Sequence, residues 1–310
     1  MKRAAAVILA LGACVLFDSC AGKKGTGCLT GAFLENRPTV ASIEQFEADY
    51  GKRPAVVLVF LDWGKYPDET VIRDVYGSGS VLMITWEPWV ASQKAAIDYG
   101  ALLGGKDNAY IREFALRLKA IGKPVLLRFA HEMNGDWYPW SASKIGKETY
   151  MEMFRHVRKV FDEAGVSNVR WVFSINAENV PRENDYGRCY PGDRFVDYIG
   201  LDGYNWGPTQ PWSRWRSFKD LFSGVYGEVV KRYQKPVMIS EFGTTSTGGD
   251  KAHWIDEALT EVKSMPAVRA LVFFNVDKET DWKIASGSEA GRALKNSLAD
   301  SYFKDSWAED

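Results

Sequence analysis

The sequence predicts a (β/α)₈ barrel, and three observations support this prediction. The 310 residues exceed a two-layer domain but fit a single barrel of about 250 residues plus a leader. Eight short apolar, β-rich runs recur along the chain. Helical patterns separate several of these runs, as in parallel sheets that are covered by helices. The competing doubly wound sheet would be favoured by a G-x-G-x-x-G nucleotide-binding motif, which the sequence lacks.

The eight predicted strands are apolar throughout, which is typical of strands that are buried on both faces. They span Leu29–Leu34, Ala55–Leu61, Val81–Trp86, Val125–Ala130, Val169–Ile175, Val196–Leu201, Val237–Ser240 and Val268–Asn275. Eight such strands are the number that the barrel requires.

The clearest helical pattern spans Asp107–Ile121, where apolar residues recur at helical spacing and Gly122 ends the helix. Similar patterns span Glu148–Ala164, Phe218–Tyr233 and Ala252–Lys263. The fourth and seventh strands both begin with Lys-Pro and an apolar run, and each is followed by a glutamate. This similarity between the two segments fits a fold that is built from repeated units.

The N-terminus predicts an export signal, because Met1–Arg3 is charged and the apolar run Ala4–Phe17 is too short to span a bilayer. We therefore predict a signal peptide over residues 1–20, a Gly/Lys/Thr-rich tether over 21–27 and one barrel domain over 28–310. Cys14 and Cys20 each resemble a bacterial lipoprotein processing site, and the sequence leaves both open. We expect an exported bacterial protein that is secreted, periplasmic or anchored to the membrane through a lipid.

Composition narrows the class of partner. The 39 basic and 40 acidic residues give a net charge of −1, so the chain lacks the excess of positive charge that is typical of nucleic-acid-binding proteins. Twelve tryptophans, many in Gly/Pro/Asp-rich stretches, favour a sugar ligand, since aromatic faces pack on pyranose rings. Cys28 and Cys189 would either form a disulfide in an oxidising compartment or stay separate, and both alternatives remain open.

Two glutamates stand directly after predicted strands. Glu132 follows the fourth strand and Glu241 lies at the end of the seventh, so both are expected at the C-terminal face, where barrel enzymes place their catalytic groups. Two carboxyl groups across an aromatic cleft suit glycosidic cleavage, which needs no cofactor. A zinc motif is excluded at His131, because Gly135 stands where His-Glu-x-x-His needs its second histidine.

The segments around both glutamates resemble glycoside hydrolase family 26, the family of β-mannanases, lichenases and some β-1,3-xylanases. Residues 128–140, RFAHEMNGDWYPW, resemble its acid/base segment, and Ile239–Gly243 resembles its nucleophile segment. Val59–Trp63 and Ile84–Trp89 resemble its second and third strand ends, so the likeness covers nearly the whole chain after the tether.

The resemblance implies a retaining double displacement with Glu132 as acid/base and Glu241 as nucleophile. It would place the two carboxyl groups about 5–5.5 Å apart. The pKa of Glu132 would have to rise, through burial beside Trp137 and through the charge of Glu241. Tyr204 matches the tyrosine that hydrogen-bonds the nucleophile, and His131 matches a histidine that contacts the sugar.

Candidate substrate-binding residues are mostly aromatic. The expected sugar platforms are Trp86, Trp137, Trp140 and Trp206, with Trp63 and Trp282 as further candidates. Four asparagines follow strand ends, and of Asn134, Asn176, Asn205 and Asn275 we favour Asn134 as a ligand of sugar hydroxyls. His-Glu-Met-Asn-Gly over residues 131–135, with Pro139 where mannanases carry tryptophan, is closer to the mixed-linkage glucanase branch.

The sequence thus predicts a monomeric endo-β-glycanase, without cofactor or metal, that hydrolyses β-1,4 bonds in mixed-linkage β-1,3-1,4-glucan or in β-mannan. The alternative is a catalytically silent carbohydrate-binding surface lipoprotein. Loss of either glutamate would favour that alternative, and both are present.

Overall fold

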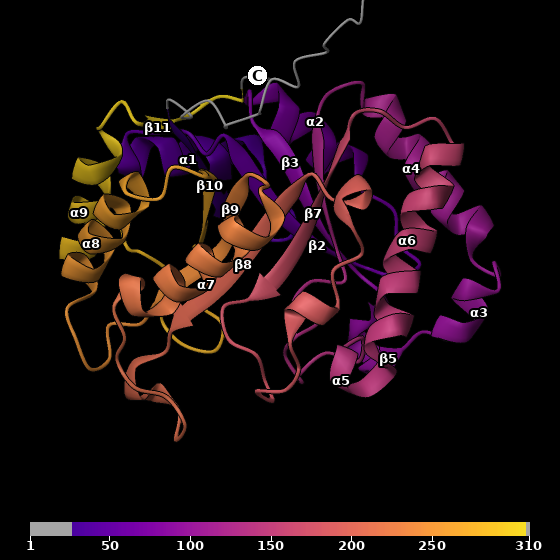
Figure 1. Ribbon diagram of the computed structural model, residues 1–310. Coiled ribbons are helices and arrows are strands. Elements are labelled where there is room, and N and C mark those ends of the chain that lie inside the picture. Colours follow the sequence, from indigo (N-terminus) through magenta and orange to yellow (C-terminus); the bar gives the residue numbers. More distant parts are fainter. Residues whose placement is uncertain (1–26, 308–310) are drawn as a thin grey trace, which may run out of the picture.

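The computed structural model describes residues 27–307, and within them eight parallel strands form a closed barrel (Figure 1). The strands follow one another around the barrel, and the last pairs with the first. They are β1 Cys28–Phe33, β2 Val56–Asp62, β3 Val81–Glu87, β6 Val125–Phe129, β7 Val169–Asn176, β8 Tyr198–Asn205, β9 Val237–Thr244 and β10 Val268–Phe274. The predicted (β/α)₈ barrel is confirmed.

Each of the eight predicted runs coincides with one strand of the barrel. The largest differences are at β8 and β9, which continue four residues past the predicted ends Leu201 and Ser240. Apart from Phe242, the residues of these extensions are polar or glycine, so the apolar pattern stops before the strand does. Tyr204 and Glu241, two of the residues predicted for the site, therefore lie within the C-terminal ends of the strands and not after them.

Helices surround the strands (Figure 1). They are α1 Val40–Tyr50, α2 Glu69–Gly77, α3 Tyr99–Leu103, α4 Asn108–Ile121, α5 Ala142–Ile145, α6 Lys147–Glu163, α7 Phe218–Tyr233, α8 Lys251–Lys263 and α9 Glu289–Leu298. The four predicted helices are α4, α6, α7 and α8. α1, α2 and α9 were not predicted, yet each starts at a side chain that caps it, namely Thr39, Asp68 and Ser288.

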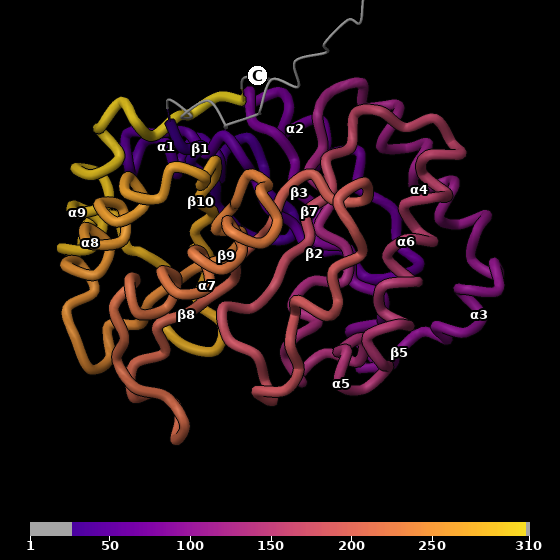
Figure 2. The backbone as a smooth tube through the Cα atoms, viewed as in Figure 1, coloured from indigo at the N-terminus to yellow at the C-terminus, as the bar shows by residue number. Residues whose placement is uncertain are grey.

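Short elements complete the chain. β4 Trp89–Val90 and β5 Ala95–Ala96 pair antiparallel between β3 and α3, and β11 Phe303–Lys304 joins the start of β1. Figure 2 shows the first and last strands of the barrel, β1 and β10, lying beside one another, as their pairing requires.

Two apolar layers hold the barrel. An inner layer fills the barrel itself and includes Leu58, Met83, Leu126 and Met238, which are at most 1% exposed. An outer layer lies between strands and helices, and there Trp171 is buried on β7. The polar site therefore sits at one end of a packed core and not in an open pore.

Cys28 and Cys189 are separate buried thiols, so the disulfide alternative is not supported within the described residues. No helix within residues 27–307 is long and apolar enough to cross a membrane. The predicted signal peptide, nearly all of the tether, and Cys14 and Cys20 lie outside the described residues.

Candidate active site

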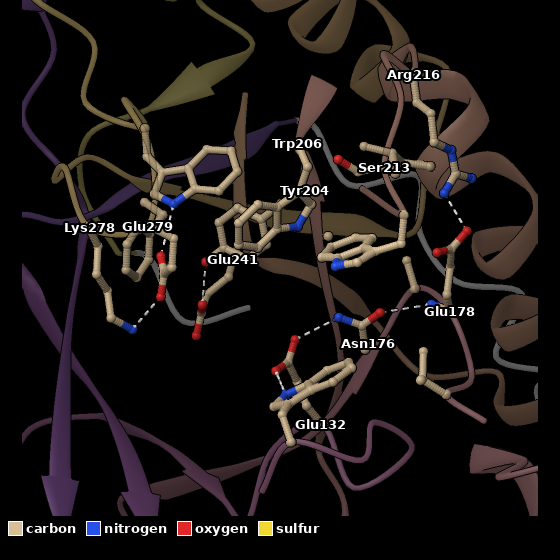
Figure 3. Close-up of a pocket in the computed structure, with 18 of the residues that line it drawn as sticks. Glu132, Asn176, Glu178, Tyr204, Trp206, Ser213, Arg216, Glu241, Lys278 and Glu279 are labelled. Atoms are coloured by element: carbon tan, nitrogen blue, oxygen red, sulfur yellow. Dashed lines mark hydrogen bonds and ion pairs between the residues drawn. The ribbon is translucent and has the colours of Figure 1, made fainter. Parts of the chain in front are cut away.

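A cavity of about 820 Å³ lies at the C-terminal ends of the strands, and both Glu132 and Glu241 line it (Figure 3). Aromatic side chains make up much of the remaining wall, namely Phe60, Trp137, Tyr138, Tyr204, Trp206, Trp212, Phe274 and Trp282. Buried carboxyl groups among apolar rings are the combination expected of a site that handles protons and binds sugars.

The Glu132 backbone is held in an uncommon conformation just after β6. Ala130 and Glu132 have positive φ values of 48° and 51°, the left-handed region that costs non-glycine residues on the order of 1–3 kcal/mol. Two contacts hold this turn: Tyr150 Oη donates to the Ala130 carbonyl at 3.0 Å, and Glu132 N donates to the Ser174 carbonyl at 2.9 Å. The turn aims the Glu132 carboxyl into the cavity.

Two neutral donors contact the Glu132 carboxyl. Trp137 Nε1 donates to Oε2 at 2.9 Å, and Asn176 Nδ2 donates to Oε1 at 2.8 Å (Figure 3). Burial, assisted by the charges of Asp202 and Glu241, nevertheless raises the pKa of Glu132 to about 8. The carboxyl is therefore mostly protonated at neutral pH, as a general acid must be.

Glu241 owes its position to a β-bulge in β9. The register between β8 and β9 shifts at Asp202, so that Leu201 pairs with Ile239 and Asp202 with Glu241. Ser240 is thereby left unpaired, and both it and Glu241 reach groups at the barrel interior. A register shift of this kind re-aims side chains at active sites.

The Glu241 carboxylate receives charged and neutral donors on its two oxygens. The Arg128 guanidinium contacts Oε1 in an ion pair that is wholly buried on the arginine side, and Tyr204 Oη donates to Oε2 at 2.5 Å. A cation and a hydroxyl in these positions stabilise the negative form that a nucleophile needs.

Arg128 contacts a second acid, Asp202, in addition to Glu241. Arg128 Nη1 donates to Asp202 Oδ2 at 2.9 Å, and Arg128 Nε donates to Thr85 Oγ1 at 2.8 Å. Burial is the main cause that raises the pKa of Asp202 to about 6, while Arg128 opposes the rise. A fully satisfied buried network of this kind fixes the guanidinium, and with it the Glu241 carboxylate.

The structure brings together five of the nine residues that were predicted for the site. Glu132, Glu241, Trp137, Tyr204 and Trp206 line the cavity, as does the further candidate Trp282. His131 is buried against Tyr138, whose hydroxyl lies 3.1 Å from Nε2, and it does not line the cavity. Its predicted contact with the sugar is therefore corrected to a contact with a wall residue.

Three tryptophans predicted as sugar platforms are packing residues instead. Trp86 is 0% exposed and stacks on Phe114 at 3.9 Å between ring centroids. Trp63 in turn stacks on Trp86. Trp140 is also 0% exposed and donates from Nε1 to the His131 carbonyl at 2.7 Å. The predictions for Trp86, Trp140 and Trp63 are wrong, because no face of these rings is free to meet a ligand.

The choice among the asparagines is also corrected. Asn134 is 0% exposed. Its Nδ2 donates to the Asn176 carbonyl at 2.9 Å, and its Oδ1 accepts from the Asn176 backbone N–H at 2.9 Å. Asn176 is the asparagine that reaches the cavity. Sequence alone could not separate them, since both follow strands. Asn205 and Asn275 are buried and bond to neighbouring protein groups.

Several residues of the site were not predicted, and Trp212, Arg128 and Asp202 are examples. Trp212 lines the cavity with 71% of its surface exposed, and its loop position was the only available signal. Arg128 stands within an otherwise apolar strand, where a charge needs a buried partner. Asp202 near the end of β8 was that partner. Among residues 27–307 no cluster of side chains could hold a metal ion.

Comparisons with known proteins agree with this geometry. The model of the family described as "Glycosyl hydrolase family 26" matches residues 83–266. Endoglucanase H of Acetivibrio thermocellus is 40% identical over 287 residues, which are 89% of this chain and 31% of that protein. Mannan endo-1,4-beta-mannosidase of Bacillus subtilis is 27% identical over 50% of this chain and 41% of its own length. The chain thus spans less than half of these relatives.

The fold has solved counterparts. The catalytic domain of Bacillus sp. JAMB-750 GH26 endo-beta-1,4-mannanase superimposes with a TM-score of 0.69 at 19% identity, covering 90% of this chain and 88% of that one. At this identity the likeness concerns the barrel alone.

Proposed function

We propose, because the chain belongs to glycoside hydrolase family 26, that it is a retaining endo-β-glycanase that cleaves β-1,4 linkages. One observation carries the proposal. Two buried glutamates line one aromatic cavity in opposite environments, Glu132 with neutral donors only and Glu241 in contact with a guanidinium. This reaction needs two carboxyl groups in different environments, one to give a proton and one to attack as a carboxylate.

In the first step, Glu241 attacks the anomeric carbon of the bound sugar and forms a glycosyl ester, while the bond to the leaving oxygen breaks. Glu132 gives its proton to that oxygen, so the leaving chain departs as an alcohol and Glu132 becomes a carboxylate. In the second step, this carboxylate takes a proton from water, whose oxygen attacks the anomeric carbon and releases Glu241. The carboxyl separation of about 5–5.5 Å that this mechanism requires stays a prediction.

Neighbouring side chains support each role. Tyr204 holds one oxygen of Glu241 and leaves the carboxylate in one orientation, and Arg128 stabilises its charge from inside the barrel. Trp137 both donates to Glu132 and presents an exposed ring, 43% accessible, to a sugar on the acid side. Trp206 and Trp212 extend this aromatic wall with their rings 5.4 Å apart.

As substrate we propose mixed-linkage β-1,3-1,4-glucan, with β-mannan as the second candidate. The first is supported by the 40% identity to a protein named endoglucanase, against 27% to a mannosidase. We propose further that the protein acts as a monomer outside the cytoplasm, with residues 1–20 as export signal and with a lipid anchor at Cys14 or Cys20. The support for this is the sequence pattern alone.

The test is reducing-sugar release by purified residues 25–310 from barley β-glucan, mannan and xylan, each in a separate assay. The control is Glu241→Ala, which should abolish turnover because no nucleophile remains. Release from β-glucan alone, or from mannan alone, would fix the substrate class. No release from any polymer, with binding of the polymers retained, would overturn the proposal in favour of a carbohydrate-binding protein.

A second variant separates the two glutamates. Glu132→Ala should retain most activity on dinitrophenyl glycosides, whose leaving group needs no proton, and lose turnover of polymers. Added azide should raise the rate of this variant further, since this anion needs no base and can attack the anomeric carbon in place of water, which releases Glu241 and forms a glycosyl azide. Complete loss on both kinds of substrate would refute the assignment of Glu132 as acid/base.

A further inference from the structure

The loop between β10 and α9, residues 275–288, brings Trp282 into the wall of the cavity that contains both glutamates. The Trp282 side chain is 1% exposed, and its ring lies 4.9 Å from the Tyr204 ring between centroids. Tyr204 Oη in turn donates to Glu241 Oε2 at 2.5 Å. The position of Trp282 therefore influences the orientation of the Glu241 carboxylate.

Lys251, the first residue of α8, holds this loop from outside the cavity. Its half-buried ammonium donates to three consecutive carbonyl groups of the loop, those of Asp281, of Trp282 at 3.3 Å and of Lys283 at 3.1 Å. These contacts use all three hydrogens of the ammonium. Lys251 thus binds the backbone of the loop through carbonyl oxygens, as a bound cation does.

A lysine in this place is unfavourable for the helix itself. The N-terminus of a helix carries a partial positive charge, so a cation in the first turn is disfavoured. The cap residue Asp250 directs its carboxyl to His253 N at 3.0 Å. Burial lowers the pKa of Lys251, which the charge of Asp281 opposes. The contacts with the loop carbonyls are the favourable interactions that offset both effects.

Asp281 joins the same loop to the segment that follows β9. Its carboxylate accepts from Thr245 Oγ1, from Ser246 N at 3.0 Å and from Ser246 Oγ. Burial alone would raise the pKa of Asp281, but the hydrogen bonds from Ser246 and Thr245 lower it to about 2, so the carboxylate is ionised near neutral pH. The loop is thereby attached to the end of the strand that carries Glu241.

Close packing leaves Trp282 little freedom on the side of β9. A Cβ added at Gly243 would lie 3.3 Å from its ring, so the ring packs directly on the β9 backbone. It also meets the Trp206 ring edge to face, with the centroids 4.8 Å apart. Trp282 Nε1 donates to Glu279 Oε2 of the same loop at 3.1 Å (Figure 3). A displaced loop would therefore carry the ring with it, away from β9 and from Tyr204.

We propose that Lys251 is a positioning residue of the active site. Its ammonium fixes the backbone at residues 281–283, which keeps the Trp282 ring against Tyr204 and so keeps the Tyr204 hydroxyl on Glu241. Lys251 touches neither the substrate nor the reacting atoms. This inference rests on the proposed function and adds to it a residue outside the cavity. The three carbonyl groups then form a cation site, which a small alkylammonium ion can occupy once the lysine side chain is removed.

The first test is chemical rescue on the polymer that wild type hydrolyses, barley β-glucan or mannan. Lys251→Ala should lower kcat/KM about 5-fold, which is less than the loss expected from removing the Tyr204 hydroxyl itself. Propylammonium chloride supplies the missing carbons and ammonium, so it should restore most of this loss and leave wild type unchanged. Tetramethylammonium chloride at the same concentration has the charge but no N–H donor, and it should restore nothing.

Two outcomes of the rescue experiment would overturn the proposal. One is a kcat/KM of Lys251→Ala within about 2-fold of wild type, since the loss of positioning is expected to exceed this. The other is a loss that propylammonium does not restore, or that both salts restore alike, because the carbonyl groups would then not act as a site for an N–H donor.

A double-mutant cycle shows whether the effect passes through Tyr204. Lys251→Met keeps a side chain of similar length without the ammonium, and it should lower kcat/KM without responding to propylammonium, because the methionine fills the site. In the Tyr204→Phe background, Lys251→Met should lower kcat/KM by less than about 2-fold further, since the hydroxyl is already absent. Multiplied losses, which a general loosening of the fold would give, would contradict the proposal.

Two further variants make the result independent of a folding defect at Lys251. Asp281→Asn weakens the second attachment of the loop; it should lower kcat/KM in wild type but not in the Tyr204→Phe background, and it should not respond to propylammonium. Lys159→Met changes an exposed lysine of α6 that pairs with Glu163, and it should match wild type. Failure of the proposed function would appear as a wild type that hydrolyses no polymer, whereas failure of this inference would appear as an active wild type with unaffected Lys251 variants or with multiplied losses.

Discussion

Replacing Asn176 by alanine should move the alkaline limit of activity to higher pH. Asn176 donates to Glu132 Oε1 at 2.8 Å, and this contact favours the ionised form of the carboxyl. A hydrogen bond to a charged group contributes about 1.5–3 kcal/mol, and one between neutral groups about 0.5–1.5 kcal/mol. The difference of roughly 1.4 kcal/mol corresponds to about one pKa unit.

Because Glu132 must be protonated to act as acid, activity is present below its pKa and falls as pH rises through it. The pKa of wild-type Glu132 is raised to about 8, so the limit should move from about pH 8 to about pH 9 in Asn176→Ala. The assay measures kcat/KM on the polymer as a function of pH for wild type and for Asn176→Ala. The pH at which kcat/KM falls is compared between the two, and not the maximum value of kcat/KM. An unchanged or lower limit would refute the assignment of that limit to Glu132.

Two controls accompany this measurement. Asn108→Ala removes a hydrogen bond to His156 at the surface and should leave the limit in place. The glycosylation step of dinitrophenyl glycosides should show no alkaline limit in wild type, because their leaving group departs without a proton.

Three shorter predictions test other parts of the site. Tyr204→Phe removes the donor to Glu241 Oε2 and should lower kcat/KM about 10-fold, with an unchanged circular dichroism spectrum. Trp86→Ala should lower the free energy of unfolding by about 3–5 kcal/mol in urea titrations, whereas Trp212→Ala should leave it unchanged and raise KM for the polymer; equal losses would contradict their assignment to core and cavity. The folded-state pKa of Glu132 is raised, so its contribution to stability is complete below its ordinary value of 4.5 and is lost as pH rises through about 8. Glu132→Gln should therefore gain in Tm over wild type between pH 5 and pH 9, and a constant difference would contradict the raised value.

Most of the fold could be predicted because barrel strands are buried on both faces. Each strand is then a continuous apolar run, and eight such runs separated by helical patterns admit few architectures. The missed helices α1, α2 and α9 have 9 to 11 residues, and their start depends on capping contacts such as Thr39 with Ser42. Such contacts are local, but serine and threonine occur at many other positions, so the pattern is not specific.

The meeting of Glu132 and Glu241 at one cavity could be predicted for a different reason. A glutamate at the C-terminal end of a barrel strand has its position fixed by the strand, wherever the rest of the chain packs. The orientation of a tryptophan ring is not fixed by the strand in this way. Trp86 and Trp206 both lie at strand ends, yet Trp86 points toward α4 and stacks on Phe114, while Trp206 lines the cavity. The side of the sheet that a ring takes decides between packing and binding, and this depends on contacts with residues far along the chain.

The different environments of the two glutamates follow from the contacts of one cation, Arg128. Arg128 lies four residues before Glu132 on the same segment, yet none of its ion pairs within the described residues is with Glu132. Arg128 instead contacts Glu241 and Asp202, which come from β9 and β8. Glu132, left with neutral donors in a buried position, holds its proton. The turn after β6 thus presents the Glu132 carboxyl to two neutral donors, while the guanidinium of the same segment contacts Glu241.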